Sequence, residues 1–514
     1  MEVVQIMIRK FSNNMAQMRR ILFLLNFLTV LLSCSLMLNI HYSPDTYCIW
    51  FVSDNDYIRH FYNSRFVSGV LYKLLAAVGI NVARSQSVFT LGFMLCVAGV
   101  CTALTRRAAA LLQVNGKTGT MALIGADAAF LLIFNNAFIS EWYIFGECMP
   151  MYGVAIVCAI WSALSYVRIL GEERKSAPRR IAVSLLALTL SLGCYQVCIG
   201  IYVSLLLIFV YIHRERSVKQ RILYAGGGLT LGAVGCVLNV VIAKILAAFG
   251  VVDAITRGMT QSPQMIWENI RSLWRSQPDL WSGTQIYPAY VLPIFFLGAL
   301  AALLWFALRH HAPAAETALA VGFAVCIYLG SFIPHYVTTD FWLSIRTLVP
   351  LIGVFSFLIL ALLANDASFP ARRFAACFAG VFLLCNALLM QDIFSNHLAS
   401  DADDTAYAQD IQACITEYTE ETGEEICALA FAKDSAVSYF YDGVDYVTHE
   451  LNIKNITVTW SDVQLINAAN GTSYERAEMD EAIWAEYFEG RNWDSFDPEE
   501  QIVFQNHTAY IVLY

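Results

Sequence analysis

Long runs of apolar residues, separated by short polar segments, fill the first three quarters of the chain. Most runs approach or exceed the roughly 18 residues with which an α-helix can cross the hydrocarbon core of a bilayer. The eleven runs lie near residues 21–40, 86–105, 118–136, 149–167, 181–194, 197–212, 222–248, 287–308, 315–334, 345–363 and 374–391. The pattern predicts an α-helical polytopic membrane protein with about eleven transmembrane helices.

The fifth and sixth runs are short and form one apolar stretch broken at Gly193-Cys194-Tyr195-Gln196. Basic residues flank this stretch at both ends, and such residues collect on the cytoplasmic side of a membrane. Equal charge at both ends predicts a hairpin of two short helices. Residues 66–80 form a further, amphipathic stretch, which we expect to lie in the membrane interface.

The pattern changes after residue 392. Residues 403–419 place apolar side chains on one helical face. Four runs typical of short strands follow. The helical face holds Tyr407, Ile411, Cys414, Ile415 and Tyr418, and the strand-like runs are 426–431, 446–449, 456–460 and 509–513. We therefore expect a membrane domain at 1–392 and a small α/β domain at 393–514.

Composition agrees with a membrane protein, because 58% of the residues are hydrophobic, only 14% are charged and the mean hydropathy is +0.55. The charge is divided unevenly. Residues 1–392 carry 28 Lys+Arg against 17 Asp+Glu, a net charge of +11, whereas residues 393–514 carry 4 against 24, a net charge of −20. A tail of that charge excludes nucleic acid as a partner.

Short basic clusters indicate which way round the chain sits. They are Arg9/Lys10/Arg19/Arg20, Arg106/Arg107, Arg168/Arg174/Lys175/Arg179/Arg180, Arg214/Arg216/Lys219/Arg221, Arg309 and Arg372/Arg373. Counting runs from a cytoplasmic N-terminus places every cluster inside. The same count places segments 41–85, 137–148, 249–286 and 335–344 and the acidic tail outside. We expect a multi-pass protein of the cytoplasmic membrane with an extracytoplasmic C-terminal domain.

The first outer segment, 41–85, holds an unusual group of charges. Asp45, Asp54 and Asp56 are followed by Arg59 and Arg65 within about twenty residues. Carboxylates serve as general bases or metal ligands, and arginine binds phosphate with two parallel hydrogen bonds. An ordinary solvated loop explains the same spacing equally well.

Two further clusters lie at predicted outer ends of spans. Glu141 and Glu147 flank an aromatic group, and carboxylates at membrane depth are costly unless they face protein or water. His335, Asp340 and Arg346 flank the tenth run. Arg346 is placed either to bind a lipid phosphate or simply to extend toward the headgroups. For the acidic pair, an aromatic belt with solvated acids is the competing interpretation.

Signals of soluble enzymes and of metal sites are missing from the sequence. We find no Walker motif, no GxSxG, and no CxxC or Cys/His spacing. Most of the 14 cysteines lie in the apolar runs, and the sequence does not decide whether Cys414 and Cys427 pair. No cofactor is therefore assigned. A divalent metal is compatible with the carboxylates, but nothing in the sequence requires one.

Several short motifs occur in a defined order. They are SPDTY, SDND, NSRF, EWYIFGE, LSLGCYQVCIGIY and FWLSIRTLVP, followed by a tail that starts near NHLASDADDTAYAQDI. This order, over most of residues 20–430, resembles the bacterial polytopic glucosyltransferases of the glucosyl transferase II type. Those proteins are related to O-antigen glucosylation enzymes and belong to the GT-C class of membrane glycosyltransferases.

The resemblance implies transfer of a sugar, typically glucose, from a polyprenyl phosphate to a cell-surface glycan outside the membrane. The family has an acidic pair in its first outer loop and then a glycine-arginine element. Here these correspond to Asp54-Asn55-Asp56 and Ser64-Arg65. The candidate catalytic residues are Asp54, Asp56 and Asp45, and either Asp54 or Asp56 is the base. The candidates for binding the donor phosphate or substrate are Arg59, Arg65, Glu141, Glu147, His335 and Arg346.

Two other functions remain open. A transporter of lipid-linked glycans also has many spans, but it often shows internal repeats and holds its charges within the spans. We see no repeat, and the charges cluster at outer ends. A non-catalytic component of cell-envelope assembly is the second alternative.

Overall fold

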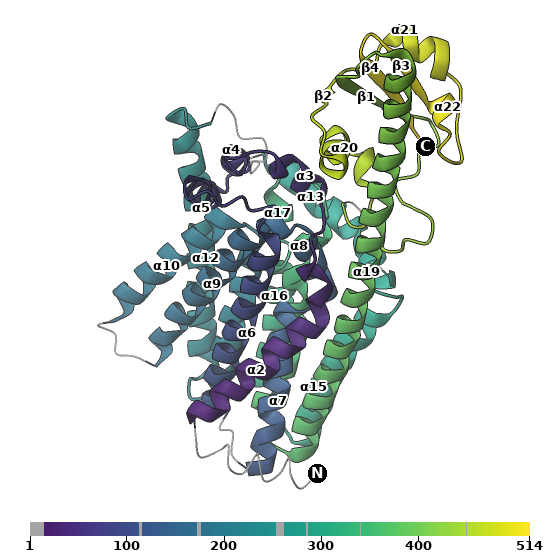
Figure 1. Ribbon diagram of the computed structural model, residues 1–514. Coiled ribbons are helices and arrows are strands. Elements are labelled where there is room, and N and C mark those ends of the chain that lie inside the picture. Colours follow the sequence, from purple (N-terminus) through teal and green to yellow (C-terminus); the bar gives the residue numbers. More distant parts are fainter. Residues whose placement is uncertain are drawn as a thin grey trace.

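The computed structural model describes residues 15–112, 116–171, 176–252, 262–283, 286–339, 341–448 and 450–514. A bundle of long helices makes up most of the protein, and a small α/β domain stands at one end of it (Figure 1). The coarse prediction of a helical membrane protein with a C-terminal α/β domain is thus confirmed. Arg9, Lys10, Arg174, Lys175, Asp340 and His449 lie outside the described residues.

Each of the eleven predicted runs contains a helix. These helices are α2 (Met15–Cys34), α6 (Gln86–Leu111), α7 (Gly116–Phe134), α9 (Met149–Val167), α10 (Ala177–Cys194), α11 (Cys198–Ile212), α12 (Val218–Ala248), α15 (Val291–Arg309), α16 (Ala314–Gly330), α18 (Ile352–Asn365) and α19 (Phe369–Thr422). Within the described ranges, eight helices are long and apolar enough to cross a membrane, whereas α11, α16 and α18 are apolar but shorter. Eleven crossings remain a prediction.

The predicted hairpin is present, because α10 ends at Cys194 and α11 begins at Cys198. Tyr195 between them is extended, with φ −153° and ψ 115°. Every residue of α11 is buried, so the second helix of the hairpin runs through the interior of the bundle. A helix that is apolar on all sides is expected at such a position.

The tenth run begins differently from the prediction. Residues 345–351 form two 3₁₀ turns, Ile345–Thr347 and Val349–Leu351, and the α-helix starts only at Ile352. Pro350 lacks the backbone N–H that a longer helix would use. Arg346 therefore lies on a turn at the end of the bundle, outside the helix.

Short helices cover the end of the bundle that carries the tail (Figure 1). They are α3 (Pro44–Trp50), α4 (Tyr57–Tyr62), α5 (Phe66–Ala77), α8 (Ser140–Ile144), α13 (Pro263–Arg275), α14 (Gln277–Gly283) and α17 (Ile333–Val337). The predicted amphipathic stretch at 66–80 is helix α5. Its interfacial position remains a prediction.

Helix α19 is the longest element of the protein and joins the bundle to the tail (Figure 1). Its 54 residues, at the 1.5 Å rise per residue of an α-helix, extend for about 80 Å. It contains both the last apolar run, 374–391, and the predicted tail helix, 403–419. The helix passes the predicted domain boundary after residue 392 without a break.

The tail contains a four-stranded sheet with helices on both faces. Its elements are β1 (Ala428–Lys433), α20 (Asp462–Asn470), β2 (Glu475–Arg476), α21 (Glu481–Ile483), α22 (Pro498–Gln501), β3 (Ile502–Gln505) and β4 (Thr508–Leu513). The strand order is β2-β1-β4-β3, with β1 parallel to β2 and β4, and β3 antiparallel to β4. Leu429 and Ile511 face a core with α19 and α20, whereas Ala430 and Val512 pack with Ile483.

Two of the four predicted strands are wrong. Ile456–Trp460 reads as a strand by composition, but Asn455–Thr457 is a 3₁₀ turn because Asp404 of α19 accepts the N–H groups of Asn455 and Ile456. Of residues 446–448, Thr448 alone pairs, in an isolated bridge with Leu451. The prediction missed β3, which turns into β4 through Asn506 and His507, both at positive φ.

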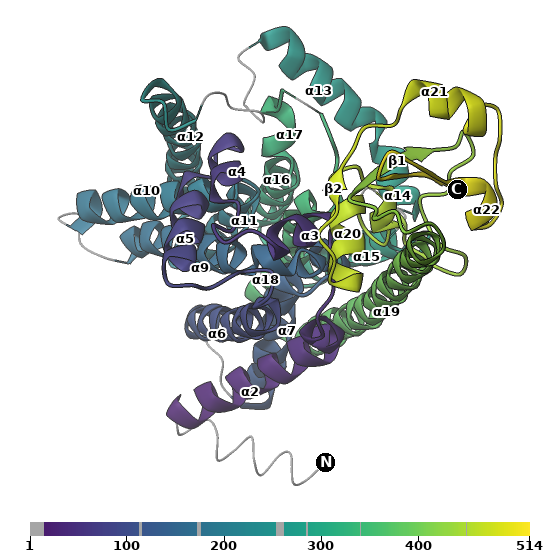
Figure 2. The same cartoon turned by 45° about the horizontal axis from the view of Figure 1, so that its top comes forward.

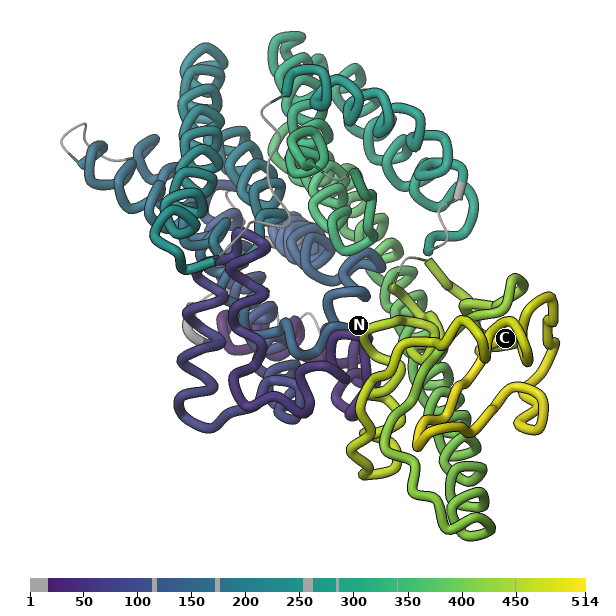
Figure 3. The backbone as a smooth tube through the Cα atoms, turned by 90° about the horizontal axis from the view of Figure 1, so that it is seen from above, coloured from purple at the N-terminus to yellow at the C-terminus, as the bar shows by residue number. Residues whose placement is uncertain are grey.

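The first outer segment and the tail lie side by side. Helix α20 lies next to α3 (Figure 2), and the view from above shows the purple loops beside the yellow-green tail (Figure 3). The opposite end of the bundle holds the start of α2, with Arg19 and Arg20, and the start of α19, with Arg372 and Arg373. The two ends thus differ in charge.

Candidate active site

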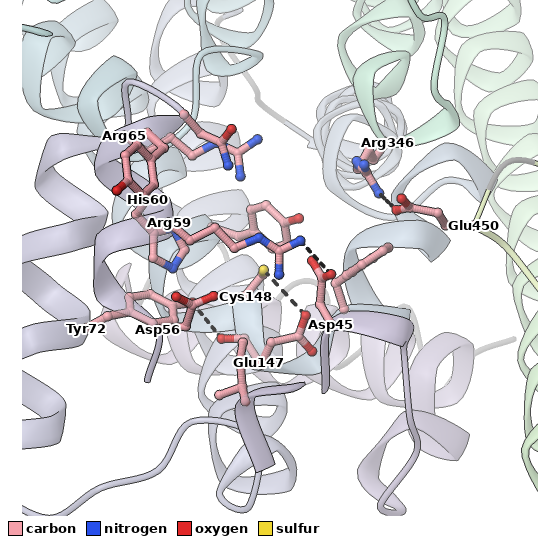
Figure 4. A pocket seen from close by; sticks show the side chains of 15 residues that line it. Asp45, Asp56, Arg59, His60, Arg65, Tyr72, Glu147, Cys148, Arg346 and Glu450 are labelled. Atoms are coloured by element: carbon pink, nitrogen blue, oxygen red, sulfur yellow. Dashed lines mark hydrogen bonds and ion pairs between the residues drawn. The ribbon is translucent and has the colours of Figure 1, made fainter. Parts of the chain in front are cut away.

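A cavity of about 460 Å³ opens where the first outer segment, the turns before α9 and α18, and the tail converge (Figure 4). Six of the nine predicted site residues line it. They are Asp45, Asp56, Arg59, Arg65, Glu147 and Arg346. The cavity also receives Glu450 from the tail, so four segments far apart in sequence build one polar site.

One wall is helix α3, which is anchored over the buried carboxylate of Glu147. Ser43 and Thr46 form a capping box at the start of the helix, and each of these hydroxyls also donates to Glu147. The Thr46 contact measures 2.8 Å. The cap places Asp45 at the first turn, where its carboxylate accepts a hydrogen bond from Arg59 at 2.6 Å.

The turn Asp54-Asn55-Asp56 determines which carboxylate faces the cavity. Asn55 and Asp56 adopt left-handed backbone conformations, with φ of 58° and 49°, which residues other than glycine rarely adopt. The buried Asn55 amide holds this turn by donating to the Ile80 carbonyl at 2.8 Å and accepting from the Val82 N–H at 3.0 Å. Asp56 therefore lines the cavity, whereas Asp54 is exposed and accepts the Asp56 N–H at 2.9 Å.

The electrostatics of the cavity distinguish Asp56 from its neighbour His60. Burial raises the pKa of the Asp56 carboxyl above its ordinary value, Arg59 opposes this, and Asp54 and Asp45 add to it. Burial lowers the pKa of His60 to about 3, with Arg65 and Arg59 acting in the same direction. Near pH 7 the imidazole is neutral and a weak base, which leaves Asp56 as the better proton acceptor.

The turn Ser64-Arg65 brings a second arginine to the cavity. Ser64 is left-handed at φ 59°, a conformation that favours glycine. Gln196, in the turn of the α10–α11 hairpin, donates to the carbonyls of Asn63 and Ser64, and Arg65 lies over the Tyr195 ring at 4.9 Å. Across the described ranges Arg65 makes no ion pair, so its guanidinium is available to an anion.

Arg346 faces Arg59 and Arg65 from the opposite wall (Figure 4). The fully buried Glu141 accepts its backbone N–H at 2.6 Å and its guanidinium at 3.0 Å. Glu450 of the tail accepts the same guanidinium at 2.7 Å. Arg346 is thus held by one carboxylate from the bundle and one from the tail, a charge-assisted arrangement that fixes its direction.

A family model described as Glucosyl transferase GtrII matches residues 34–363. The chain belongs to this family. No curated protein and no solved structure matches the chain. In this GtrII member the matched region contains every cavity-lining residue except Glu450, which the tail contributes.

Three predicted site residues of the GtrII chain do not line the cavity. Asp54 is exposed, as described above, and Glu141 lies behind Arg346. His335 is buried, and its Nε2 contacts the hydroxyl of Thr347, in the turn that carries Arg346, at 2.9 Å. Burial lowers the pKa of His335 to about 4, so its ring is neutral. Glu141 and His335 thus support the Arg346 turn.

Sequence reasoning missed several residues of the GtrII cavity. His60 and Tyr72 lie on α4 and α5, with ring centroids 4.2 Å apart, and the Tyr72 hydroxyl donates to the Glu147 carbonyl at 2.5 Å. Cys148 and Glu450 complete this group. The sequence DxxRHFYNSR, with a histidine between the two arginines, is a signal that could have identified His60. Glu450 had none.

The described side chains also bear on metal binding. Across the described ranges, no group of three or more His, Cys, Asp or Glu side chains is placed to hold a metal ion. Cys414 and Cys427 are free thiols. The GtrII cavity is lined by four carboxylates, three guanidinium groups and a neutral imidazole, and these groups are suited to proton transfer beside a bound anion.

Proposed function

We propose that this protein transfers glucose from a polyprenyl phosphate to a cell-surface glycan on the outer side of the cytoplasmic membrane. Membership of the GtrII family supports glucosyl transfer. The observation that supports the donor class is the cavity, which is lined by the partly buried carboxylate of Asp56, by Arg346 and by Arg65, an arginine without an ion-pair partner among the described residues. Guanidinium groups are suited to a leaving phosphate.

The proposed orientation rests on charge. Basic residues at the starts of α2 and α19 mark the end away from the tail, and such residues favour the cytoplasmic side. The cavity and the acidic tail then lie outside. A polyprenyl chain would lie in the bilayer, with its phosphate at the level of the cavity.

The mechanism assigns the base to Asp56. Its carboxylate accepts the proton of the acceptor hydroxyl, and the hydroxyl oxygen attacks the anomeric carbon opposite the phosphate. The bond from that carbon to the phosphate oxygen breaks, and the lipid phosphate leaves with the electron pair, so the configuration inverts. Arg65 and Arg346 stabilise the charge that develops on the phosphate.

The position of the charged residues favours an enzyme over a transporter. The cavity lies at the tail end of the bundle, whereas a transporter is expected to hold substrate near the middle of its spans. Asp127 is a carboxylate that lies well within a span, and its contacts there are with neighbouring helices. Asp127 of α7 accepts hydrogen bonds from Asn26 of α2 and Thr105 of α6, and it thereby joins three helices.

The test compares two neighbouring carboxylates. Asp56→Asn removes the base and should lower the transfer rate by about 10²–10⁴-fold. Asp54→Asn is the matched control, because the asparagine oxygen can still accept the Asp56 N–H, and its rate should stay near that of the unmodified protein. Transfer is measured with glucosyl polyprenyl phosphate in membranes that contain equal amounts of folded protein. Normal activity of Asp56→Asn would refute the assignment.

A second measurement tests the function as a whole. Cells from which the gene is deleted should lose glucose from a surface glycan, and the unmodified gene should restore it. An unchanged glycan composition would exclude the proposed acceptor class.

A further inference from the structure

A second hollow lies in the tail, next to the cavity. It is an open groove of about 660 Å³, within the range of about 300–1,000 Å³ that is usual for ligand sites. Glu450 lines both the groove and the cavity. The side chain that binds Arg346 therefore also forms part of the groove, and the two hollows are adjacent.

The lining of the groove combines aromatic rings with hydroxyl groups. Tyr439 and Trp460 line it and leave 49% and 46% of their surfaces exposed. Thr459 is exposed and supplies a hydroxyl, whereas Thr448 and Thr457 line the groove but are buried, and the Thr457 hydroxyl donates to the Lys454 carbonyl. Half-exposed aromatic rings beside hydrogen-bonding groups suit a sugar, whose C–H face is apolar and whose rim is polar.

The charges of the groove nearly cancel. Among the described residues of its lining, Lys433 and Glu450 are the charged ones, and the Lys433 amine lies 5.0 Å from the centre of the Tyr439 ring. The surrounding tail has a net charge of −20. Such a field repels a polyanionic chain, so a neutral ligand fits this surface best.

The groove is also tied to the first outer segment. Cys48, on α3, donates its thiol to the Trp460 carbonyl at 2.8 Å. Helix α3 also carries Asp45, which lines the cavity. The groove is thereby held in a defined position relative to the reacting carboxylate.

We infer that this groove binds a neutral carbohydrate chain and is the acceptor-glycan site of the proposed reaction. The inference rests on the proposed function. A chain bound along Tyr439 and Trp460 would pass Glu450 and present a hydroxyl to Asp56 beyond it. The tail then serves to bind the acceptor, while the bundle binds the donor.

The test separates acceptor binding from chemistry. Full-length protein in lipid nanodiscs is supplied with glucosyl polyprenyl phosphate and with surface polysaccharide extracted from cells that lack the gene. Trp460→Ala and Tyr439→Ala should each raise KM for the polysaccharide by about tenfold, as loss of one aromatic contact predicts. The kcat at saturating polysaccharide and KM for the donor should stay unchanged.

Phe440→Ala is the matched control, since Phe440 adjoins Tyr439 and is 48% exposed but does not line the groove. Trp460→Phe keeps an aromatic ring, so its KM should stay near normal. This variant still tests the aromatic contact if Trp460→Ala folds poorly. Groove variants with the KM of the control would overturn the acceptor site. Failure of the unmodified protein to transfer glucose to the polysaccharide would instead refute the proposed function.

The salt dependence of KM tests whether the ligand is neutral. KM for the polysaccharide should change little between low and high salt, because a neutral chain feels no long-range field. A KM that falls steeply as salt screens the tail would indicate an anionic acceptor and overturn this part of the inference.

Discussion

At the residue scale, the site depends on a few side chains that fix the direction of others. Asn55 holds a left-handed turn through bonds to Ile80 and Val82, and this turn directs Asp56 into the cavity. Gln196 and Tyr195 do the same for Arg65. Such supporting residues keep reacting groups within the narrow geometry that catalysis requires.

The pH dependence of transfer should report the ionisation of Asp56. A base acts only when it is ionised, so the rate falls as the pH drops through the pKa of Asp56. Burial raises that pKa, and the acidic limb should therefore lie above the pH at which an ordinary aspartate titrates. Arg59→Gln removes a positive charge that opposes the shift, and it should move the limb to higher pH.

A control variant should shift the acidic limb in the opposite direction. Asp45→Asn removes a negative charge that raises the pKa of Asp56, so it should move the acidic limb to lower pH. Both shifts are read from kcat/KM against pH in nanodiscs. Limbs that coincide in all three proteins would show that another group controls the acidic limb.

The sequence identified the types of residue at the site more reliably than their roles. Carboxylates and arginines in the first outer segment were visible as an unusual group of charges. Asp54 and Asp56 are two positions apart, and only the conformation of Asn55 decides between them. That conformation depends on hydrogen bonds to Ile80 and Val82, which lie 25 and 27 positions away, and no local pattern shows them.

At the scale of elements, the 3₁₀ turn Ile345–Thr347 is held by groups from α8. Glu141 accepts the Arg346 N–H, and the Trp142 indole donates to the Arg346 carbonyl at 2.8 Å. Both groups belong to a helix of five residues, Ser140–Ile144. The turn and the helix therefore form one unit, which carries Arg346.

Two variants separate the carboxylates that bind Arg346. Glu141→Ala removes one of the two carboxylates that pair with the buried Arg346 guanidinium. It should lower the free energy of unfolding by about 3–5 kcal/mol. Glu450→Ala removes a partner with 19% of its side chain exposed, and its loss of stability should be clearly smaller. Thermal unfolding in detergent measures both, and equal losses would contradict the ranking.

Each of the eleven apolar runs corresponds to a helix of the described structure, because such a run can be recognised from the local sequence. The turn before α18 was not predictable, since it forms where Glu141, about 200 positions earlier, binds the chain. The strands likewise divide into those that the local sequence predicts and those that a distant contact prevents. Residues 456–460 have the composition of a strand, but Asp404 takes up the backbone N–H groups that a sheet would use.

At the scale of the whole molecule, hydrogen bonds join the tail to the first outer segment. Asn455 donates to the Tyr42 carbonyl at 3.1 Å, and Asp401 of α19 accepts the Tyr42 N–H at 2.8 Å. Tyr42 directly precedes the cap of α3. The position of the tail is therefore coupled to the helix that carries Asp45.

Loss of this coupling should slow transfer without unfolding the tail. Asn455→Ala removes the bond to Tyr42 and a second one to Asp401. Asn470→Ala is the matched control, because it removes two bonds to carbonyls within α19 and α20. Both variants should lose similar stability, whereas only Asn455→Ala should lose activity. Equal transfer rates would show that the contact with the tail is not needed.

The sequence indicated a separate acidic tail but not that the tail completes the cavity. Glu450 lies 104 positions from Arg346, and nothing in the acidic tail distinguishes it from its neighbours. Their meeting depends on α19 and on the contacts of Tyr42, which are properties of the assembled fold.

Helix α19 also bears on where along a surface polymer glucose would be added. A flexible linker would let the tail move freely above the bilayer, whereas an unbroken helix resists bending and keeps it at one height. Inserting four residues would raise the tail by about 6 Å and turn it by about 40°. The number of residues in α19 is therefore a measure of distance, and under the proposed function it would set which sugar unit of a chain growing from the membrane comes level with Asp56, the proposed base.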